Sequence, residues 1–341
     1  MLHVAVHGVS GERLDLELQP ESQVKAVKQH IELVWSVPAR FQKLVRDVLV
    51  LSDTDLMGEH CTAKGTPFVL TMVLSLASAK EDLESGRASQ QLRALDDLAS
   101  LGPRGGAISV SLLCAHLGDA SPDVRRAAQR AFSRTAGRGD ECAVAAAVPG
   151  LAARSWRARL GSVLALEFVA VQRDAMVLEV LEGALEDDSC HVRRAAVQAL
   201  ASLAAPSDRV VCLLAARLED TTCWVRAAAV KAVTAVAEWG DPHVVALLGA
   251  RLAEDKDRET RRVAMQALAE VAMPGDQCTL ALLARQLEDE GVVVRRSAVE
   301  AIAALAEPGD GHVAGLLSAR LRDDSPKVRM AAAAGLQALT S

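Results

Sequence analysis

The sequence has very few aromatic residues. They make up 2% of its 341 residues, and tyrosine is absent, although half of the chain is apolar. A core must therefore be built from alanine, leucine and valine, which favours closely packed helices. No apolar run approaches the length of about 18 residues that a membrane span needs. The net charge of −6 provides no global basic field for nucleic acid, so we expect neither a membrane nor a nucleic-acid partner.

The sequence also lacks the closely spaced cysteine pairs that are typical of metal-binding sites. Seven cysteines are scattered along the chain without a CxxC pair: Cys61, Cys114, Cys142, Cys190, Cys212, Cys223 and Cys278. Such an odd, unclustered set indicates reduced thiols that mostly fill small spaces in a core. The opening residues alternate and carry early acids, unlike a secretory signal. We expect a cytoplasmic protein, with the nucleus as the alternative, and no cofactor or metal.

Residues 1–75 show a period-two pattern that indicates strands. Apolar residues alternate at Leu2, Val4 and Val6, and again at Leu14, Leu16 and Leu18, which predicts a hairpin turning at residues 8–11. A helical stripe follows at Val24, Val27, Ile31 and Val34, with Ser22 as its cap. Short apolar runs at residues 44–45 and 48–51 precede a last alternating strand at residues 68–74. The predicted order is ββαβ, a short segment, then β.

This region resembles ubiquitin-like domains over its full length. The matching segments are MLHVAVHGVSG, LELQPES, VKAVKQHIELVW, SVPARFQKLV and FVLTMVL, in that order. The resemblance implies an α+β β-grasp fold and an apolar binding patch on the sheet, at Val45, Val69 and Thr71 with Gly8 and Val9 beside them. No Gly-Gly tail follows Leu74, so conjugation to other proteins is not expected. A folded module without a receptor is the alternative.

Residues 107–341 repeat with a period of about 34 residues. One register consists of arginines at 125, 157, 193, 226, 261, 295 and 329. Six residues before each stands an aspartate, except at Leu151: Asp119, Asp187, Asp220, Asp255, Asp289 and Asp323. Another register consists of aspartates expected to cap first helices: Asp140, Asp174, Asp208, Asp241, Asp276 and Asp310. Second helices are expected to start after Ser121, Ser189, Thr222, Asp257 and Ser325.

Alanine-rich helix pairs of this length stack into an all-α solenoid, here of about seven pairs. Residues 76–106 are expected to be a linker and an N-terminal half-repeat cap, with an apolar stripe at Leu92, Leu95, Leu98 and Leu101. The segment resembles HEAT repeats of the short, bilin-lyase-like type. Their hallmark is a turn aspartate followed six residues later by Val-Arg, as in Asp187 with Val192-Arg193.

The recurring acid and base are interpreted as a structural ladder. Each arginine is expected to meet an aspartate of its own or an adjacent repeat at one edge of the stack. The predicted ladder consists of Asp119, Arg125, Asp187, Arg193, Asp220, Arg226, Asp255, Arg261, Asp289, Arg295, Asp323 and Arg329. Arg251 is placed outside it. The repeat around Arg157 lacks the aspartate and contains Pro149-Gly150, which predicts an irregularity.

Two enzymatic alternatives share this scaffold. Deoxyhypusine hydroxylases bind iron through His-Glu dipeptides, and this sequence contains none. Bilin lyases use the same short repeats to handle a pigment, but no local pattern here marks a pigment site. We therefore favour a non-enzymatic scaffold that grips a protein partner, with catalytic residues assigned to no position.

The partner surface is expected on the second helices, at the residue after each ladder arginine and one turn later. Its predicted cations are Arg126, Arg130, Arg194, Lys231, Arg262 and Arg296. This basic stripe in an acidic protein predicts an acidic partner segment or surface, although a solvated face without a partner is the alternative. The last repeat is expected to expose an apolar flank, a surface for self-association.

Overall fold

The computed structural model describes residues 1–8, 11–60, 68–205 and 207–340. The chain divides into two compact units, Met1–Ala170 and Val171–Ser341, which are described separately. Two residues named in the sequence analysis lie outside the described residues. They are Cys61, one of the seven cysteines, and Val9, which was placed beside the predicted apolar patch.

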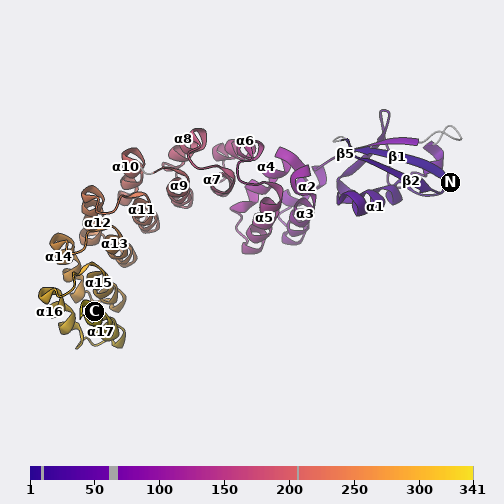
Figure 1. The fold of residues 1–341 in the computed structure, drawn as a ribbon. Helices are drawn as coiled ribbons and strands as arrows, with labels where there is room; N and C mark the ends of the chain where they lie inside the picture. The colour runs from indigo at the N-terminus through magenta and orange to yellow at the C-terminus, as the bar shows by residue number, and fades with distance from the viewer. Residues whose placement is uncertain (9–10, 61–67, 206, 341) are drawn as a thin grey trace. The chain divides into compact units, whose positions relative to one another are not determined.

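The first unit begins with a five-stranded sheet and one helix (Figure 1). Its elements are β1 Leu2–Gly8, β2 Arg13–Leu18, α1 Val24–Trp35, β3 Gln42–Arg46, β4 Leu49–Val50 and β5 Phe68–Leu74. The strand order is β2-β1-β5-β3-β4, with β1 and β5 parallel and the other pairs antiparallel. The element order agrees with the expected ββαβ pattern and its late final strand.

The apolar face of α1 packs against the sheet. Val24, Val27 and Ile31 are fully buried, as the stripe predicts. Two details of the prediction are wrong. Val34 is exposed and Trp35 is buried in its place, because the helix ends there and the chain turns at Ser36 in a left-handed conformation. Gln23, not Ser22, is the N-cap residue, and its side chain makes no capping hydrogen bond.

Residues 76–106, which were predicted to be a linker and a half-repeat cap, are largely helical. They form α2 Ala77–Glu84, α3 Ala88–Leu101 and a 3-10 turn, after which α4 spans Gly106–Leu117. The stretch Ala88–Leu117 is long and apolar enough in composition to cross a membrane. It is interrupted by the turn at residues 102–105, and three of its leucines, Leu95, Leu98 and Leu113, are fully buried within the unit.

Arg40 connects the sheet region to these helices. Its guanidinium lies 2.5 Å from Asp82 on α2 and 2.6 Å from Asp97 on α3. Burial raises the pKa of Asp97, and the Arg40 charge only partly offsets this effect. Sheet and helices are therefore joined by a partly buried ion-pair cluster within one compact unit.

The rest of the first unit contains the predicted irregularity. It consists of α5 Pro122–Thr135, α6 Glu141–Ala147, a 3-10 turn at Val148–Ala152, and α7 Trp156–Val169. The first helix of this repeat is short because Pro149-Gly150 falls where it would continue. Helix α7 packs directly on α4. A Cβ on Gly161 would lie 1.9 Å from the carbonyl oxygen of Cys114, so only glycine permits this approach.

The second unit is a regular stack of helix pairs. Its helices are α8 Ala175–Ala184, α9 Cys190–Leu203, α10 Asp208–Ala216, α11 Cys223–Val236, α12 Pro242–Glu254, α13 Arg258–Val271, α14 Gln277–Arg285, α15 Val292–Leu305, α16 Gly311–Arg320 and α17 Pro326–Thr340. The second helices α9, α11, α13, α15 and α17 pack on one another in order. Many alanines on these helices are buried, which permits the close spacing that the aromatic-poor composition predicts.

The predicted first-helix caps are confirmed except one. The aspartates Asp140, Asp174, Asp241, Asp276 and Asp310 accept backbone N–H bonds from the first turn. At α10, the cap is Ser207, and Asp208 is the first helical residue. The predicted second-helix cap residues Ser121, Ser189 and Thr222 occupy the N-cap position without a side-chain hydrogen bond, whereas the Asp257 side chain accepts the N–H of Thr260.

The expectation that the cysteines mostly fill the core is wrong. Cys142, Cys212 and Cys278 are exposed, and Cys190 and Cys223 are half-buried. Cys114 is buried, and burial raises the pKa of its thiol to about 12. Alanine occurs on both the buried and the exposed faces of these helices, so the sequence pattern does not reveal which face a cysteine occupies.

Candidate protein-interaction surfaces

The arginine–aspartate ladder exists in the second unit and has a defined direction. Arg193, Arg226, Arg261 and Arg295 each donate Nη1 to carbonyl oxygens of their own repeat's turn and bind the aspartate carboxylate of the next repeat. Arg226 Nη1 lies 2.9 Å from the Asp220 oxygen, while its Nε and Nη2 lie 2.6 and 2.8 Å from the Asp255 carboxylate. Within the described residues of this unit, such pairs are Arg193–Asp220, Arg226–Asp255, Arg261–Asp289 and Arg295–Asp323.

The same aspartates also hold the turns. The carboxylate of Asp255 accepts the backbone N–H of Asp257 at 2.9 Å, and five other ladder aspartates accept the equivalent N–H two residues later. Burial raises the pKa of the Asp255 carboxyl, but the hydrogen bonds from Arg226 and Asp257 N–H outweigh burial and hold it below its usual value. The carboxylate is therefore ionised, and its hydrogen bonds go to Arg226 and to the turn, which is a structural role.

In the irregular repeat, the arginine assigned to the repeat register is wrong. Arg159, not Arg157, donates Nη1 to the turn carbonyls, of Ala153 at 3.0 Å and Arg154 at 3.2 Å. The guanidinium of Arg157 instead lies over the Trp156 ring, 4.5 Å from its centroid. The corrected register runs 125, 159, 193, and the aspartate position is therefore Ala153, not Leu151.

Two ladder arginines have the turn contacts without a carboxylate. Arg125 Nη1 lies 2.7 and 3.0 Å from the carbonyl oxygens of Asp119 and Ala120, and Arg329 Nη1 lies at the same distances from those of Asp323 and Asp324. No carboxylate hydrogen bond to either arginine occurs within the described residues. At Arg125 the cause is Ala153, which stands where the next repeat would supply aspartate.

A second row of arginines was not predicted. Arg217, Arg251 and Arg320, at the ends of first helices, donate to a carbonyl of the preceding repeat and pair with a glutamate there. Arg251 lies 2.6 Å from Glu219 and is buried. Arg251 thus lies outside the arginine–aspartate ladder, as predicted, but it belongs to this second row of buried charges. The 34-residue spacing of these arginines is the signal that could have identified them.

The six predicted cations of the second-helix face differ in their surroundings. Three are paired with acids on their own helix: Arg126 with Asp123, Arg262 with Glu259, and Arg296 with Glu300. Arg262 is also less accessible than expected, with 23% of its side chain exposed. The other three, Arg130, Arg194 and Lys231, are exposed and make no ion pair within the described part of the chain, although the charge of Lys231 helps to lower the pKa of Glu259. Arg126 and Arg130 belong to the first unit and the other four to the second.

A hollow on α9, α11 and α13 brings together two of these cations that make no ion pair. Its volume is about 310 Å³, and Arg194, Lys231 and Trp224 line it. The indole of Trp224 is 59% exposed and lies 6.5 Å from the His191 ring. Glu259 is the one acid in the lining, and its hydrogen bonds go to Arg262. Trp224 was missed, although a lone tryptophan in an alanine-rich helix is a visible signal.

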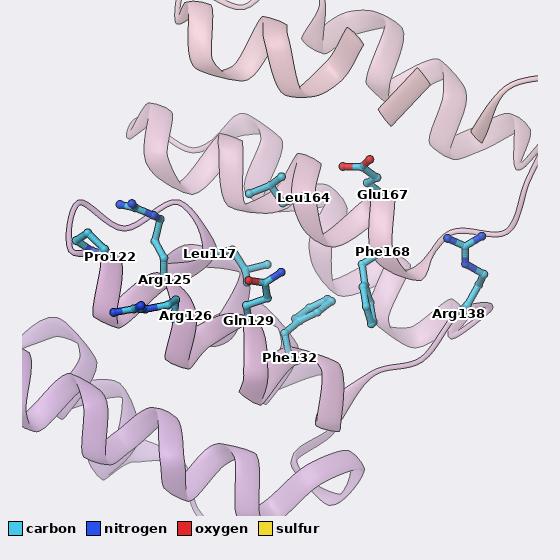
Figure 2. Close-up of a pocket in the computed structure, with 10 residues that line it drawn as sticks. All are labelled: Leu117, Pro122, Arg125, Arg126, Gln129, Phe132, Arg138, Leu164, Glu167 and Phe168. Atoms are coloured by element: carbon cyan, nitrogen blue, oxygen red, sulfur yellow. The ribbon is translucent and has the colours of Figure 1, made fainter. Parts of the chain in front are cut away.

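A larger pocket lies between α5 and α7 in the first unit (Figure 2). Its volume is about 740 Å³, and its lining includes Arg125, Arg126, Arg138, Phe132 and Phe168. The two phenyl rings face each other edge to face with centroids 5.7 Å apart. This pocket was not predicted, because it depends on how α7 packs on α4.

The predicted patch of the sheet region is assembled by strand pairing. Val45 pairs with Thr71, and Val69 pairs with Ala5, so these residues occupy one face of adjacent strands β3, β5 and β1. Val69 and Thr71 are exposed, and Val45 is half-buried. The structure thus brings the three predicted residues together on the face opposite α1.

The histidines do not form a metal site with neighbouring acids. Within the described residues, no group of three or more His, Cys, Asp or Glu side chains could hold a metal ion. His116 lies 3.4 Å from Asp119, where it belongs to the first turn of the ladder.

Two family models match the helical repeats. One is described as HEAT repeats and matches residues 212–303; the other is described as a HEAT repeat associated with sister chromatid cohesion and matches residues 172–200. The solenoid-like region contains HEAT repeats. These repeats generally mediate protein–protein interactions, and HEAT families are typically non-enzymatic scaffolds. Neither description names the bilin-lyase-like type or a ubiquitin-like domain.

A crystal structure of an engineered protein is similar to this chain at 21% identity and a TM-score of 0.43, over 77% of this chain and 78% of that one. No curated protein matches the sequence.

Proposed function

We propose that this protein is a non-enzymatic interaction scaffold whose HEAT repeats bind an acidic segment of a protein partner at the hollow on α9, α11 and α13. The observation that carries the proposal is the grouping of Arg194, Lys231 and exposed Trp224 around one hollow. Neighbouring cations on the same face are neutralised by acids of their own helices. The positive potential of this face is therefore concentrated at the hollow.

The residue types suit recognition of an acidic, partly apolar chain. Tryptophan and arginine dominate the energetics of protein interfaces, because they bury large area and make directed contacts. Cations that are exposed when free accelerate association with an acidic partner and are screened by salt over about 8 Å at physiological ionic strength. The three side chains project from helices that pack directly on one another, so their backbone positions are set by the stack.

The test uses a capped twelve-residue peptide of glutamate, leucine and phenylalanine, followed by calorimetry at low and high salt. The double variant Arg194→Glu/Lys231→Glu should lose binding, and Trp224→Ala should weaken it by about tenfold or more. The control is Arg296→Glu, which alters a cation outside the hollow that is already paired with Glu300. Unchanged affinity in the double variant would remove the hollow as the binding site.

The sheet region is proposed to be a ubiquitin-like docking module. This is supported by its strand order and by the joint exposure of Val69 and Thr71 next to Val45. Because no Gly-Gly tail follows Leu74, the module would act by binding and not by conjugation. Incubation with ubiquitin-type activating enzyme should form no thioester; formation of one would contradict this role.

The competing function is a pigment-handling or iron-dependent enzyme on the same scaffold. Purified protein should be colourless and free of iron if the scaffold proposal is correct. Stoichiometric iron or visible absorbance would favour the enzymatic alternatives. We further propose a cytoplasmic location, with the nucleus as the alternative.

A further inference from the structure

The pocket between α5 and α7 combines an apolar floor with a cationic rim. Phe132 is buried and Phe168 is 44% exposed, and their rings provide the apolar part of the lining. Arg125, Arg126 and Arg138 are exposed at the rim (Figure 2). A volume of about 740 Å³ is within the range of about 300–1,000 Å³ that is typical of ligand pockets.

The pocket exists because this repeat departs from the regular stack. In the second unit, consecutive second helices pack side by side, as α9 and α11 do. In the first unit, α4 packs against both α5 and α7, and the backbone of α4 at Cys114 lies so close to Gly161 of α7 that a Cβ there would clash. Helices α5 and α7 meet through the rings of Phe132 and Phe168, and a hollow remains beside those rings.

Arg125 lines this pocket and lacks the aspartate partner that four other ladder arginines have. Its Nη1 makes the same turn contacts as every other ladder arginine, which orients the guanidinium. In the second unit, the remaining Nε and Nη2 atoms bind an aspartate that stands 27 to 29 residues later, as in Arg193–Asp220 and Arg226–Asp255. The residue 28 positions after Arg125 is Ala153.

We propose that a partner polypeptide supplies this missing carboxylate: an aspartate or glutamate side chain binds Arg125, and an adjacent large apolar side chain rests against Phe132 and Phe168. The inference rests on the proposed role as a protein-binding scaffold and adds a second contact site to it. Four pairs in the same chain use this arginine–carboxylate geometry. A guanidinium already fixed by two carbonyl contacts loses little further freedom when it binds a carboxylate.

The pocket's charge favours this occupant. Three arginines and a single acid, Glu167, are among the lining residues. Arg126 is partly neutralised by Asp123, whereas Arg125 has no carboxylate hydrogen bond within the described residues. An anionic group is therefore attracted to the Arg125 end, while the phenyl rings provide an apolar contact beside it.

The experiment measures binding of the capped peptide acetyl-Leu-Asp-Phe-Leu-amide by saturation-transfer NMR. The matched probe has asparagine in place of aspartate, which keeps the shape and removes the charge. The full chain carries Arg194→Glu/Lys231→Glu as background, so that the hollow on α9, α11 and α13 does not contribute. Arg125→Ala is compared with Arg329→Ala, which removes the same turn contacts at the same distances outside the pocket.

The aspartate peptide should bind the background protein and its Arg329→Ala form equally. Arg125→Ala, or asparagine in the peptide, should weaken binding by about tenfold or more, as expected for loss of a hydrogen bond between charged groups. Equal binding of the two peptides, no effect of Arg125→Ala, or no peptide binding would overturn the proposal.

A small-molecule arm separates the two sources of a carboxylate. Binding of 3-phenylpropionate but not of the peptide would assign the pocket to a small organic acid and overturn the polypeptide proposal. None of these negative results affects the hollow at Arg194 and Lys231. The scaffold proposal is tested there with its own peptide, so the two failures are distinguishable.

Discussion

Arg226 and Asp255 form a ladder pair whose carboxylate is almost completely buried. The guanidinium binds the carboxylate with two hydrogen bonds of 2.6 and 2.8 Å, and 1% of the Asp255 side chain is exposed. The pair connects two successive repeats, while the same aspartate holds the turn between α12 and α13. One acid thus fixes both the turn and the stacking register.

Removal of one partner of this pair should strongly destabilise the stack. Arg226→Ala leaves the Asp255 carboxylate buried without its cation, at an expected cost of about 3–5 kcal/mol. Arg329→Ala is the control, because it removes the same kind of turn contacts but no carboxylate pair. Denaturant unfolding measures the difference, and equal losses would contradict a structural role for the pair.

The second row of arginines should contribute as well. Arg251→Ala removes a buried cation bound to Glu219 and to the Leu218 carbonyl, with an expected loss of about 1.5–3 kcal/mol. Arg285 occupies the equivalent position one repeat later, where it is exposed and has no ion pair within the described residues. Its replacement by alanine should change the midpoint of unfolding very little, and a larger loss there than at Arg251 would be inconsistent with this row.

Acid should weaken the ladder. The pKa values of Asp220, Asp255, Asp289 and Asp323 are below their usual value. Burial raises the pKa of each, but hydrogen bonds from arginine and backbone N–H outweigh it, and at Asp323 the hydrogen bond from Arg295 is the largest single effect. A carboxyl with a lowered folded-state pKa stabilises the fold above its unfolded pKa of about 3.9, and this contribution is lost as pH falls through the folded value.

The melting temperature should therefore drop steeply below about pH 4. Asp255→Asn should melt at lower temperature at neutral pH but lose less on acidification, since it has one titrating group fewer. A variant with the same acid dependence as the natural protein would exclude Asp255 as a contributor.

Thiol reactivity should separate the cysteines. Because the pKa of Cys114 is raised to about 12 and the thiol is buried, it should resist alkylation by iodoacetamide at neutral pH in the folded protein. The exposed Cys142, Cys212 and Cys278 should be modified first, as peptide mass spectrometry can establish. Early modification of Cys114 would indicate that α4 opens under native conditions.

The sequence predicts the helix pairs and the residues of the ladder, because both depend on spacing along one chain. It does not predict the direction of the pairs, since an aspartate 6 residues before or 28 residues after the arginine satisfies the same periodicity. The error at Arg157 arose where two arginines, Arg157 and Arg159, follow a turn without aspartate. Strict use of the 34-residue period would have selected Arg159.

The candidate sites are less predictable than the repeats. Identifying the free cations requires knowledge of which acids lie within reach on the same helix, as Glu259 does for Arg262. The pocket at Arg125 depends on the approach of α7 to α4 at Gly161, a contact between residues far apart in the chain. The absence of aspartate at position 153 is nevertheless visible in the sequence.

The central claim, that the hollow on α9, α11 and α13 binds an acidic segment, is tested most directly by reversing the charges on both sides. The glutamate-containing peptide should bind the natural protein and fail to bind Arg194→Glu/Lys231→Glu. A peptide with lysine in place of every glutamate should show the opposite preference, with little change in the melting temperature of the variant, because both residues are exposed. Binding is measured by calorimetric titration. The account would be contradicted if the lysine peptide did not bind the variant, or if the glutamate peptide bound the variant as well as it binds the natural protein.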